Sequence, residues 1–236
     1  MRTKLKKCLD ERCFNLLELK AIIFDMDGVL FDTMPNHAKA WSESMHQHGI
    51  NFYQTDAYEH EGRTGKGTIE YIIRRELQRE PTPAELDSIY STKKKIFDQL
   101  PLGQQMPGAY EFLSKIAQGQ LRTMIVTGSK QQSSLERIKT IYKGFFTDDS
   151  IVSGNDVRFG KPDPEPYCMA LKKGGLKPNE AIVIENAPLG IQSAKGAGIF
   201  TIAVNTGPLS DEILYNAGAD CVFGSLSELS EEWDNL

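Results

Sequence analysis

Short apolar runs alternate with amphipathic segments along most of the chain. The run Ala21-Ile22-Ile23-Phe24 is apolar at every position, which is typical of a strand buried on both faces of a parallel sheet. Similar runs recur at 121–126, 151–152, 181–184, 200–204 and 221–223, and helical spacing fills the intervals at 109–118, 131–141, 164–173, 189–197 and 210–216. Strands that alternate with helices predict an α/β fold with a doubly wound parallel sheet.

The stretch from about residue 35 to residue 100 contains no strand-like run. Helical spacing there covers 37–48, 67–80 and 83–100. Thr82 precedes the last of these segments and is its expected N-cap. The first strand is therefore separated from the others by an all-helical insertion. We expect an α/β core domain formed by 1–34 and 101–236 and a smaller helical cap domain formed by 35–100, with linkers near 34–35 and 104–107.

The first twenty residues and the cysteines add little chemistry. Residues 3–19 are expected to form an amphipathic helix whose apolar face carries Leu5, Leu9, Cys13, Leu16 and Leu17. The four cysteines, Cys8, Cys13, Cys168 and Cys221, include no CxxC pair and no neighbouring histidine cluster. A zinc site or a disulfide framework is not expected, and the thiols are interpreted as scattered and reduced.

The composition is that of an ordinary globular protein, with 40% hydrophobic and 25% charged residues. The formal net charge of −5 does not favour non-specific binding of nucleic acid. No apolar run approaches the roughly 20 residues that span a bilayer. The basic start of the chain is followed by Asp10 and Glu11, which interrupt any apolar signal segment. We therefore expect a cytoplasmic protein, acting as a monomer, with no nucleic-acid or membrane partner.

Chemically active side chains follow several of the predicted strands. They are Asp25 and Asp27 after the first strand, Thr127-Gly128-Ser129 after the second, Glu185 and Asn186 after the fourth, and Lys161 in a loop before the fourth. In an open α/β sheet such positions converge at the carboxyl edge. Carboxylates suit Mg²⁺, whereas a lysine and the amides of a helix N-terminus suit phosphate. Each signal alone is more often an ordinary turn, but their order along the chain predicts a site for Mg²⁺ and phosphate.

Four segments resemble the motifs of the haloacid dehalogenase superfamily. They are Asp25-Met26-Asp27-Gly28-Val29-Leu30, Thr127-Gly128-Ser129, Lys161-Pro162 and Glu185-Asn186-Ala187-Pro188-Leu189-Gly190. The resemblance covers about residues 20–225. Because the helical insertion follows the first motif, the chain looks most like the β-phosphoglucomutase branch, which has a Rossmann-like core and a helical cap.

The resemblance implies a role for each matching residue. Asp25 would be the nucleophile that forms an aspartyl-phosphate, and Asp27 would first protonate the leaving oxygen and then activate the incoming one. Thr127 and Lys161 would hold the phosphoryl oxygens, with Gly128 and Ser129 binding the substrate at the helix N-terminus. Mg²⁺ would be held by Asp25, the backbone carbonyl of Asp27, and the pair Glu185 and Asn186. This division agrees with phosphoryl transfer, which depends mostly on positioning and charge neutralisation.

Asn186 departs from the family pattern, which usually has a second aspartate there. Asparagine keeps an oxygen ligand but removes one negative charge, so Mg²⁺ should bind more weakly unless another carboxylate compensates. Glu61 is the candidate, because in this branch the cap loop that contains it faces the core site. The alternative interpretation makes Glu61 and its neighbour Arg63 a solvated surface pair.

Four further cap residues are candidates for substrate binding. Arg63 could contact a distal phosphate, and so could Lys66 or Lys93. His37 lies two turns into the first cap helix, near the place of the cap hinge in the family. The alternatives are an ordinary helix-surface histidine at 37 and a solvated face formed by Lys93-Lys94-Lys95.

These residues fit three functions: a phosphohydrolase, a sugar-phosphate mutase and a catalytically idle phosphate-binding protein. The presence of both Asp25 and Asp27 argues against the idle protein, and Asp27 and Glu185 are not needed for dehalogenation. Glu61 near the phosphate site would repel a sugar phosphate unless a cation bridged them. A small, highly charged substrate carried with Mg²⁺, such as pyrophosphate, suits Glu61 better. We predict Mg²⁺-dependent hydrolysis of a small phosphorylated metabolite, with pyrophosphate as the candidate substrate and interconversion of β-glucose 1-phosphate and glucose 6-phosphate as the alternative.

Overall fold

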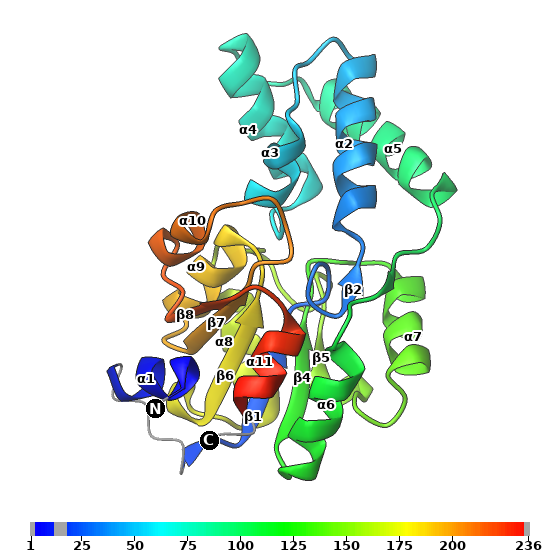
Figure 1. The fold of residues 1–236 in the computed structure, drawn as a ribbon. Coiled ribbons are helices and arrows are strands. Elements are labelled where there is room, and N and C mark those ends of the chain that lie inside the picture. Colours follow the sequence, from blue (N-terminus) through cyan, green and yellow to red (C-terminus); the bar gives the residue numbers. More distant parts are fainter. Residues whose placement is uncertain (1–2, 12–17, 234–236) are drawn as a thin grey trace.

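The computed structural model describes residues 3–11 and 18–233 of the chain. Its centre is a six-stranded parallel sheet with the strand order β5-β4-β1-β6-β7-β8 (Figure 1). The strands are β1 (Ala21–Phe24), β4 (Arg122–Val126), β5 (Ile151–Val152), β6 (Ala181–Glu185), β7 (Phe200–Val204) and β8 (Cys221–Phe223). The predicted fold is confirmed, and each predicted strand is present at or within one residue of its expected bounds.

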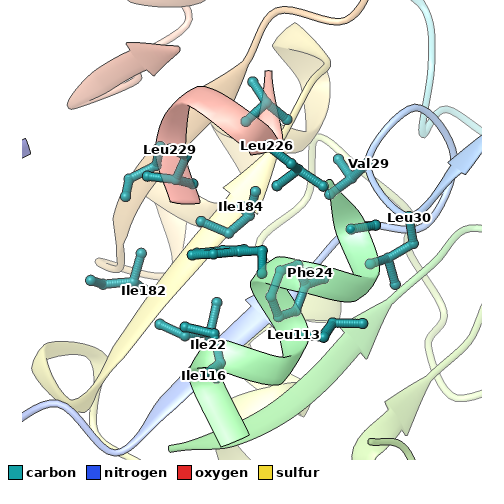
Figure 2. Close-up of a cluster of buried hydrophobic side chains, with 14 of the residues drawn as sticks. Ile22, Phe24, Val29, Leu30, Leu113, Ile116, Ile182, Ile184, Leu226 and Leu229 are labelled. Atoms are coloured by element: carbon teal, nitrogen blue, oxygen red, sulfur yellow. The ribbon is translucent and has the colours of Figure 1, made fainter. Parts of the chain in front are cut away.

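Helices cover both faces of this sheet. They are α1 (Lys4–Glu11), α6 (Ala109–Gln118), α7 (Gln132–Ile141), α8 (Glu165–Gly174), α9 (Pro188–Gly196), α10 (Asp211–Asn216) and α11 (Leu226–Trp233), with single 3₁₀ turns at Asp148–Ser150 and Pro178–Glu180. Ile22 and Phe24 pack in one apolar cluster with residues of α6 and α11 (Figure 2), whereas Ile23 packs in a second cluster with residues of α8. Because both faces are covered, β1 is apolar at every position.

The structure describes helix α1 over Lys4–Glu11 of the predicted segment 3–19. Leu5 and Leu9 are buried in the core as expected, and Cys13, Leu16 and Leu17 lie outside the described residues. The backbone N–H of Lys20 donates to the Glu180 carbonyl oxygen at 2.8 Å, so the chain already runs into the sheet there and is not helical up to residue 19. Within 3–11 and 18–233, each helix is too short or too polar to cross a bilayer.

Four helices lie together beyond the carboxyl ends of the strands (Figure 1). They are α2 (Met34–Gln47), α3 (Gln54–Glu59), α4 (Gly65–Leu77) and α5 (Pro83–Gln99). They bury an apolar cluster of their own that includes Trp41, Phe52 and Ile72. Thr82 caps α5 as predicted, because its Oγ1 accepts the backbone N–H of Glu85 at 3.2 Å. Helix α3 was not predicted, since six residues are too few for helical periodicity to show.

The chain enters and leaves this helical group through two short strands that the sequence pattern did not predict. Strand β2 (Phe31–Asp32) pairs antiparallel with β3 (Gln104–Gln105), and α2 begins two residues after β2. Two residues are too few to show the alternation that identifies a strand. The paired strands hold the two crossings side by side between the sheet and the four helices (Figure 1).

Candidate active site

The strand order places a topological switch at β1, because the chain continues to β4 on one side of β1 and later to β6 on the other. Ligands of open α/β sheets bind at such a point, outside the carboxyl ends of the strands. Asp25 directly follows β1, and its backbone N–H donates to the Ile184 carbonyl oxygen at 2.9 Å. Thr127 follows β4 and Glu185 ends β6. Asp25, Thr127 and Glu185 are all buried.

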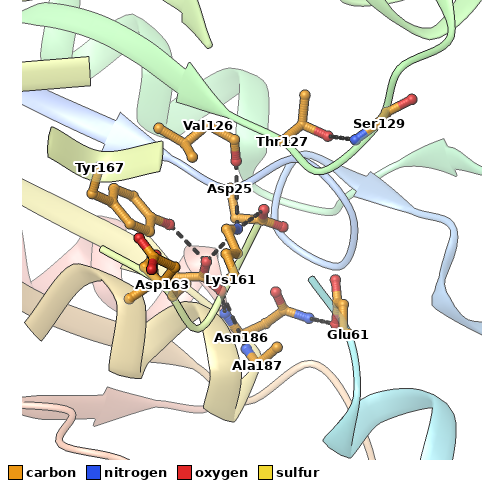
Figure 3. Close-up of polar contacts among 12 residues, drawn as sticks. Asp25, Glu61, Val126, Thr127, Ser129, Lys161, Asp163, Tyr167, Asn186 and Ala187 are labelled. Atoms are coloured by element: carbon orange, nitrogen blue, oxygen red, sulfur yellow. Dashed lines mark hydrogen bonds and ion pairs between the residues drawn. The ribbon is translucent and has the colours of Figure 1, made fainter. Parts of the chain in front are cut away.

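Lys161 contacts the carboxylates of both Asp25 and Glu185, and Figure 3 shows it beside Asp25. Its Nζ donates to Asp25 Oδ1 and, at 2.6 Å, to Glu185 Oε1. The Tyr167 hydroxyl donates to the same Glu185 oxygen at 2.6 Å. Burial alone would lower the pKa of Lys161, but attraction to Asp25 and Glu185 outweighs it and raises the pKa. The amine is therefore cationic at neutral pH.

Negative charge is in excess at this point of the structure. Burial raises the pKa of Asp25 to about 7, and repulsion by Glu185 and Asp27 works in the same direction against the attraction of Lys161. Burial, followed by repulsion from Asp25 and Glu185, raises the pKa of Glu61 well above its ordinary value. Two buried lysines, Lys161 beside Asp25 and Glu185 and Lys93 near Asp27, cannot balance four carboxylates, so the site favours an additional cation.

The cap reaches the core motif through Glu61, in the loop after α3. Asn186 Nδ2 donates to Glu61 Oε2 at 2.8 Å (Figure 3). The other oxygens of the two side chains, Glu61 Oε1 and Asn186 Oδ1, are buried and have no hydrogen-bond partner among the described residues. Unpartnered buried oxygens need an explanation such as an ion, and oxygen ligands are those that Mg²⁺ prefers. The donor set therefore fits Mg²⁺, and the carboxylate of Glu61 is not the solvated surface group of the alternative interpretation.

Two glycines make room for this arrangement. Gly28 has φ +80°, and a Cβ there would lie 2.2 Å from Asn186 Nδ2. A Cβ on Gly190, in the first turn of α9, would lie 1.9 Å from Glu185 Oε1. Only glycine combines the left-handed backbone at residue 28 with the close approach of the asparagine amide.

Asp27 faces the cap helices. Thr33 Oγ1 donates to Asp27 Oδ1 at 2.5 Å, and His37 Nε2 lies 3.8 Å from the same oxygen. Burial would raise the pKa of Asp27, but His37, Thr33 and Lys93 outweigh it and hold the pKa below its ordinary value. Burial and the charge of Lys93 lower the pKa of His37. At neutral pH Asp27 is therefore an anion beside a neutral imidazole.

Lys93 lies behind His37 and is only 8% exposed. Its Nζ donates to His37 Nδ1 at 3.1 Å and lies 4.6 Å from the centre of the Phe97 ring. Burial lowers its pKa to about 8. The interpretation of the three lysines as a solvated face therefore holds for the exposed Lys94 and Lys95. It is wrong for Lys93, because the partners of Lys93 come from α2 and from the next turn of α5.

The loop after β4 forms one wall of a small cavity. The Ser129 N–H donates to Thr127 Oγ1 at 3.1 Å, and Gln131 N–H donates to Ser129 Oγ at 3.3 Å, which shapes the turn into α7 (Figure 3). The cavity, of about 40 Å³, is lined by Gly62, Arg63, Thr127, Gly128, Lys130, Arg158 and Lys161, among others. Ser129 does not line it and instead holds the loop together. The lining combines cationic side chains with backbone amides and suits an anion.

The structure brings the predicted site residues together around Asp25, with Ser129 in the supporting loop. Three residues of the site were not predicted: Thr33, Arg158 and Tyr167. Thr33 precedes α2 and is six residues from Asp27, but nothing in that spacing indicates a contact. Tyr167 reaches Glu185 only because α8 packs against the sheet, and no local motif distinguishes it from any other buried helical tyrosine.

Comparison with known proteins agrees with the fold and the site. The family model of haloacid dehalogenase-like hydrolases matches residues 22–204. Hexitol phosphatase A of Escherichia coli K12 is 30% identical over 190 residues, which cover 80% of this chain and 84% of that protein. β-Phosphoglucomutase of Bacillus subtilis 168 is 27% identical over 227 residues, covering 92% and 96%.

A solved structure from Bacteroides vulgatus, provisionally named a β-phosphoglucomutase, is 49% identical and superposes with a TM-score of 0.89 over 97% of this chain and 93% of that one. The relatives are phosphoryl-transfer enzymes, and the aspartate, lysine and acidic motifs that resemble this family meet here at one sheet edge. The chain is a phosphoryl-transfer enzyme that belongs to the haloacid dehalogenase-like hydrolases, in their β-phosphoglucomutase-like branch.

Proposed function

We propose that the protein is a Mg²⁺-dependent pyrophosphohydrolase that acts through an aspartyl-phosphate on Asp25. The observation that carries the proposal is the contact of Glu61 with Asn186 at 2.8 Å, with the remaining oxygen of each side chain buried and unpartnered. Burial raises the pKa of Glu61 well above its ordinary value, so this carboxyl group ionises most readily beside a bound cation. Pyrophosphate carried with Mg²⁺ brings the cation that these oxygens lack, and it binds as the cap (35–100) closes on the core (1–34 and 101–236).

The ion would be held by Asp25, the backbone carbonyl of Asp27, Glu185 and Asn186, with Glu61 added from the cap. When bound, Mg²⁺ supplies neutralisation of phosphoryl charge. Lys161 and Thr127 orient the phosphoryl group for the nucleophile, and the Lys161 ammonium shields it from the Asp25 carboxylate. Burial of all three side chains excludes bulk water from the reacting atoms.

The reaction proceeds in two balanced steps. An Asp25 carboxylate oxygen attacks one phosphorus, the bond from that phosphorus to the bridging oxygen breaks, and the first phosphate leaves. Water then attacks the same phosphorus while Asp27 accepts its proton, and the bond to Asp25 breaks to release the second phosphate. The lowered pKa of Asp27 suits the base of the second step. Phosphate is a good leaving group and needs little help from an acid, whereas a sugar alkoxide must be protonated as it leaves. An anionic Asp27 therefore suits pyrophosphate better as the substrate.

The alternative is a phosphatase or mutase of phosphorylated sugars. It is supported by the names of the relatives, which include a hexitol phosphatase and a β-phosphoglucomutase. An open cavity of about 590 Å³ flanked by Arg63 and Arg158 could accept a second phosphate. The smaller cavity of about 40 Å³ shares Arg63, Arg158 and Lys161 with this open one and has room for a small anion.

A substrate panel tests the proposal, with pyrophosphate, β-glucose 1-phosphate plus a bisphosphate primer, and p-nitrophenyl phosphate, each with Mg²⁺ and with EDTA. Glu61→Ala should lower kcat/KM for pyrophosphate by about 100-fold, which is the size of effect seen when a group that supports metal binding is removed. It should change hydrolysis of p-nitrophenyl phosphate little, because the cap cannot enclose that ester. The matched control is Glu43→Ala, which removes an exposed carboxylate on α2.

The panel also separates substrate from mechanism. Conversion of β-glucose 1-phosphate to glucose 6-phosphate at rates far above pyrophosphate hydrolysis would overturn the proposed substrate and leave the Asp25 chemistry in place. Full turnover of every substrate in EDTA would overturn the metal dependence.

A further inference from the structure

Two thiols that are 213 residues apart in the sequence meet at the surface of the core. Cys8 lies on α1 and Cys221 begins β8, and their Sγ atoms are 2.6 Å apart. Both are free cysteines. A disulfide joins its sulfurs at about 2.05 Å, so this pair needs to close by only about half an ångström. The interpretation of the cysteines as scattered is therefore wrong for these two, because no spacing along the chain shows that α1 packs beside β8.

Contacts on both sides of Cys8 hold α1 in this position. Leu5 and Leu9 are buried in the same apolar cluster as Cys221. The backbone N–H of Leu5 donates to Glu232 Oε2 at 3.1 Å. Lys4 Nζ lies 4.6 Å from the centre of the Phe223 ring. The meeting of the two sulfurs is thus part of the packing of α1 on the core.

The two thiols differ in accessibility and in acidity. Cys8 is partly exposed and Cys221 is buried. The hydrogen bond with the Cys221 thiol lowers the pKa of Cys8, with a smaller contribution from the Lys4 ammonium, against the opposing effect of burial. A partly exposed thiol in contact with a buried partner is the arrangement in which one sulfur attacks and the other resolves.

We propose that Cys8 and Cys221 are a redox-active pair that is oxidised to an intramolecular disulfide by a low-molecular-weight disulfide such as oxidised glutathione. The Cys8 thiolate attacks one sulfur of the external disulfide, whose S–S bond breaks to release one thiolate and leave a mixed disulfide on Cys8. Cys221 loses its proton and attacks Cys8 Sγ, which forms the intramolecular bond and releases the second thiolate. Two protein thiols are oxidised, the external disulfide is reduced, and the two protons end on its two thiols.

The cross-link would fasten α1, which precedes the family-matched segment 22–204, to the last strand of the sheet. Helix α1 lies on the side of the core away from the cap helices (Figure 1). Oxidation should therefore raise resistance to unfolding, because it closes a long loop in the unfolded chain, and should leave turnover at Asp25 unchanged. This inference does not depend on the proposed function.

The test equilibrates the full-length protein with mixtures of reduced and oxidised glutathione, blocks free thiols by alkylation and digests with trypsin. Cleavage at lysine and arginine places the four cysteines on four separate peptides, 8–12, 13–20, 159–172 and 196–236. We expect free thiols to fall from four to two, peptides 8–12 and 196–236 to be linked, and the unfolding midpoint to rise. Dithiothreitol should reverse all three changes.

Cys8→Ser should abolish both the link and the rise in midpoint, and Cys221→Ala should do the same. Cys168→Ser is the matched control, because it removes an exposed thiol on α8 and should leave both effects intact. Persistence of four thiols in oxidised glutathione would overturn the proposal. So would a mixed disulfide on Cys8 that is never resolved, or a link from Cys8 to Cys13.

Discussion

Replacing Asp25 with asparagine should abolish turnover and yet make the metal-free protein harder to unfold at alkaline pH. Asp25 is 5% exposed, and burial beside Glu185 and Asp27 raises its pKa from 3.8 to about 7. Asparagine has the shape of the neutral carboxylic acid, so Asp25→Asn removes the repelled charge without opening a void. It cannot attack phosphorus as a carboxylate, and no other group in the site replaces it.

The size of the effect follows from the linkage between proton binding and folding. The folded chain keeps the Asp25 proton up to about pH 7, whereas the unfolded chain releases it near pH 4. The contribution of this carboxyl group to stability is therefore complete below about pH 4 and is lost as pH rises to about 7. The variant should exceed wild type in free energy of unfolding by up to about 4 kcal/mol at pH 8 and up to about 2 kcal/mol at pH 5.

Urea unfolding followed by tryptophan fluorescence, in EDTA at pH 5 and pH 8, measures this difference. Glu43→Gln, an exposed carboxylate changed in the same way, should give no gain at either pH. Adding Mg²⁺ at pH 8 should shrink the gain of Asp25→Asn, because the wild-type charge is then neutralised. A variant no more stable than wild type at pH 8, or equally stabilised at both pH values, would refute the reasoning.

Three further changes test the surroundings of Asp25. Asp27→Asn should slow pyrophosphate hydrolysis by about 100-fold or more and let the aspartyl-phosphate accumulate, as acid-quenched protein-bound phosphate will show. Because burial lowers the pKa of Lys93 to about 8, activity should decline as pH rises through 8, and Lys93→Met should remove that limb of the pH–rate profile. A Cβ on Gly207 would lie 2.8 Å from the Tyr58 ring of the cap, so Gly207→Val should hinder closure and raise KM for pyrophosphate while the unfolding midpoint stays within a few degrees of wild type.

Much of the fold and the centre of the site could be predicted from the sequence, because the relevant signals are local. A strand covered on both faces must be apolar at every position, as 21–24 is, and alternation with helices then implies a parallel sheet. The carboxyl ends of such strands meet at one edge, so Asp25, Thr127 and Glu185 converge. Because asparagine at 186 removes one negative charge, the sequence suggested Glu61 as the compensating carboxylate, and the two side chains are in contact at 2.8 Å.

Only the tertiary structure decided which residues of distant elements touch. Lys93 belongs to a run of three lysines that reads as a solvated face, but the packing of α5 against α2 buries it behind His37. Tyr167 meets Glu185 because α8 covers the sheet, and Cys8 meets Cys221 because α1 packs beside β8. Spacing along the chain specifies which face of an element a residue occupies. It does not specify which element covers that face, and burial, pKa and hydrogen-bond partner all depend on the covering element.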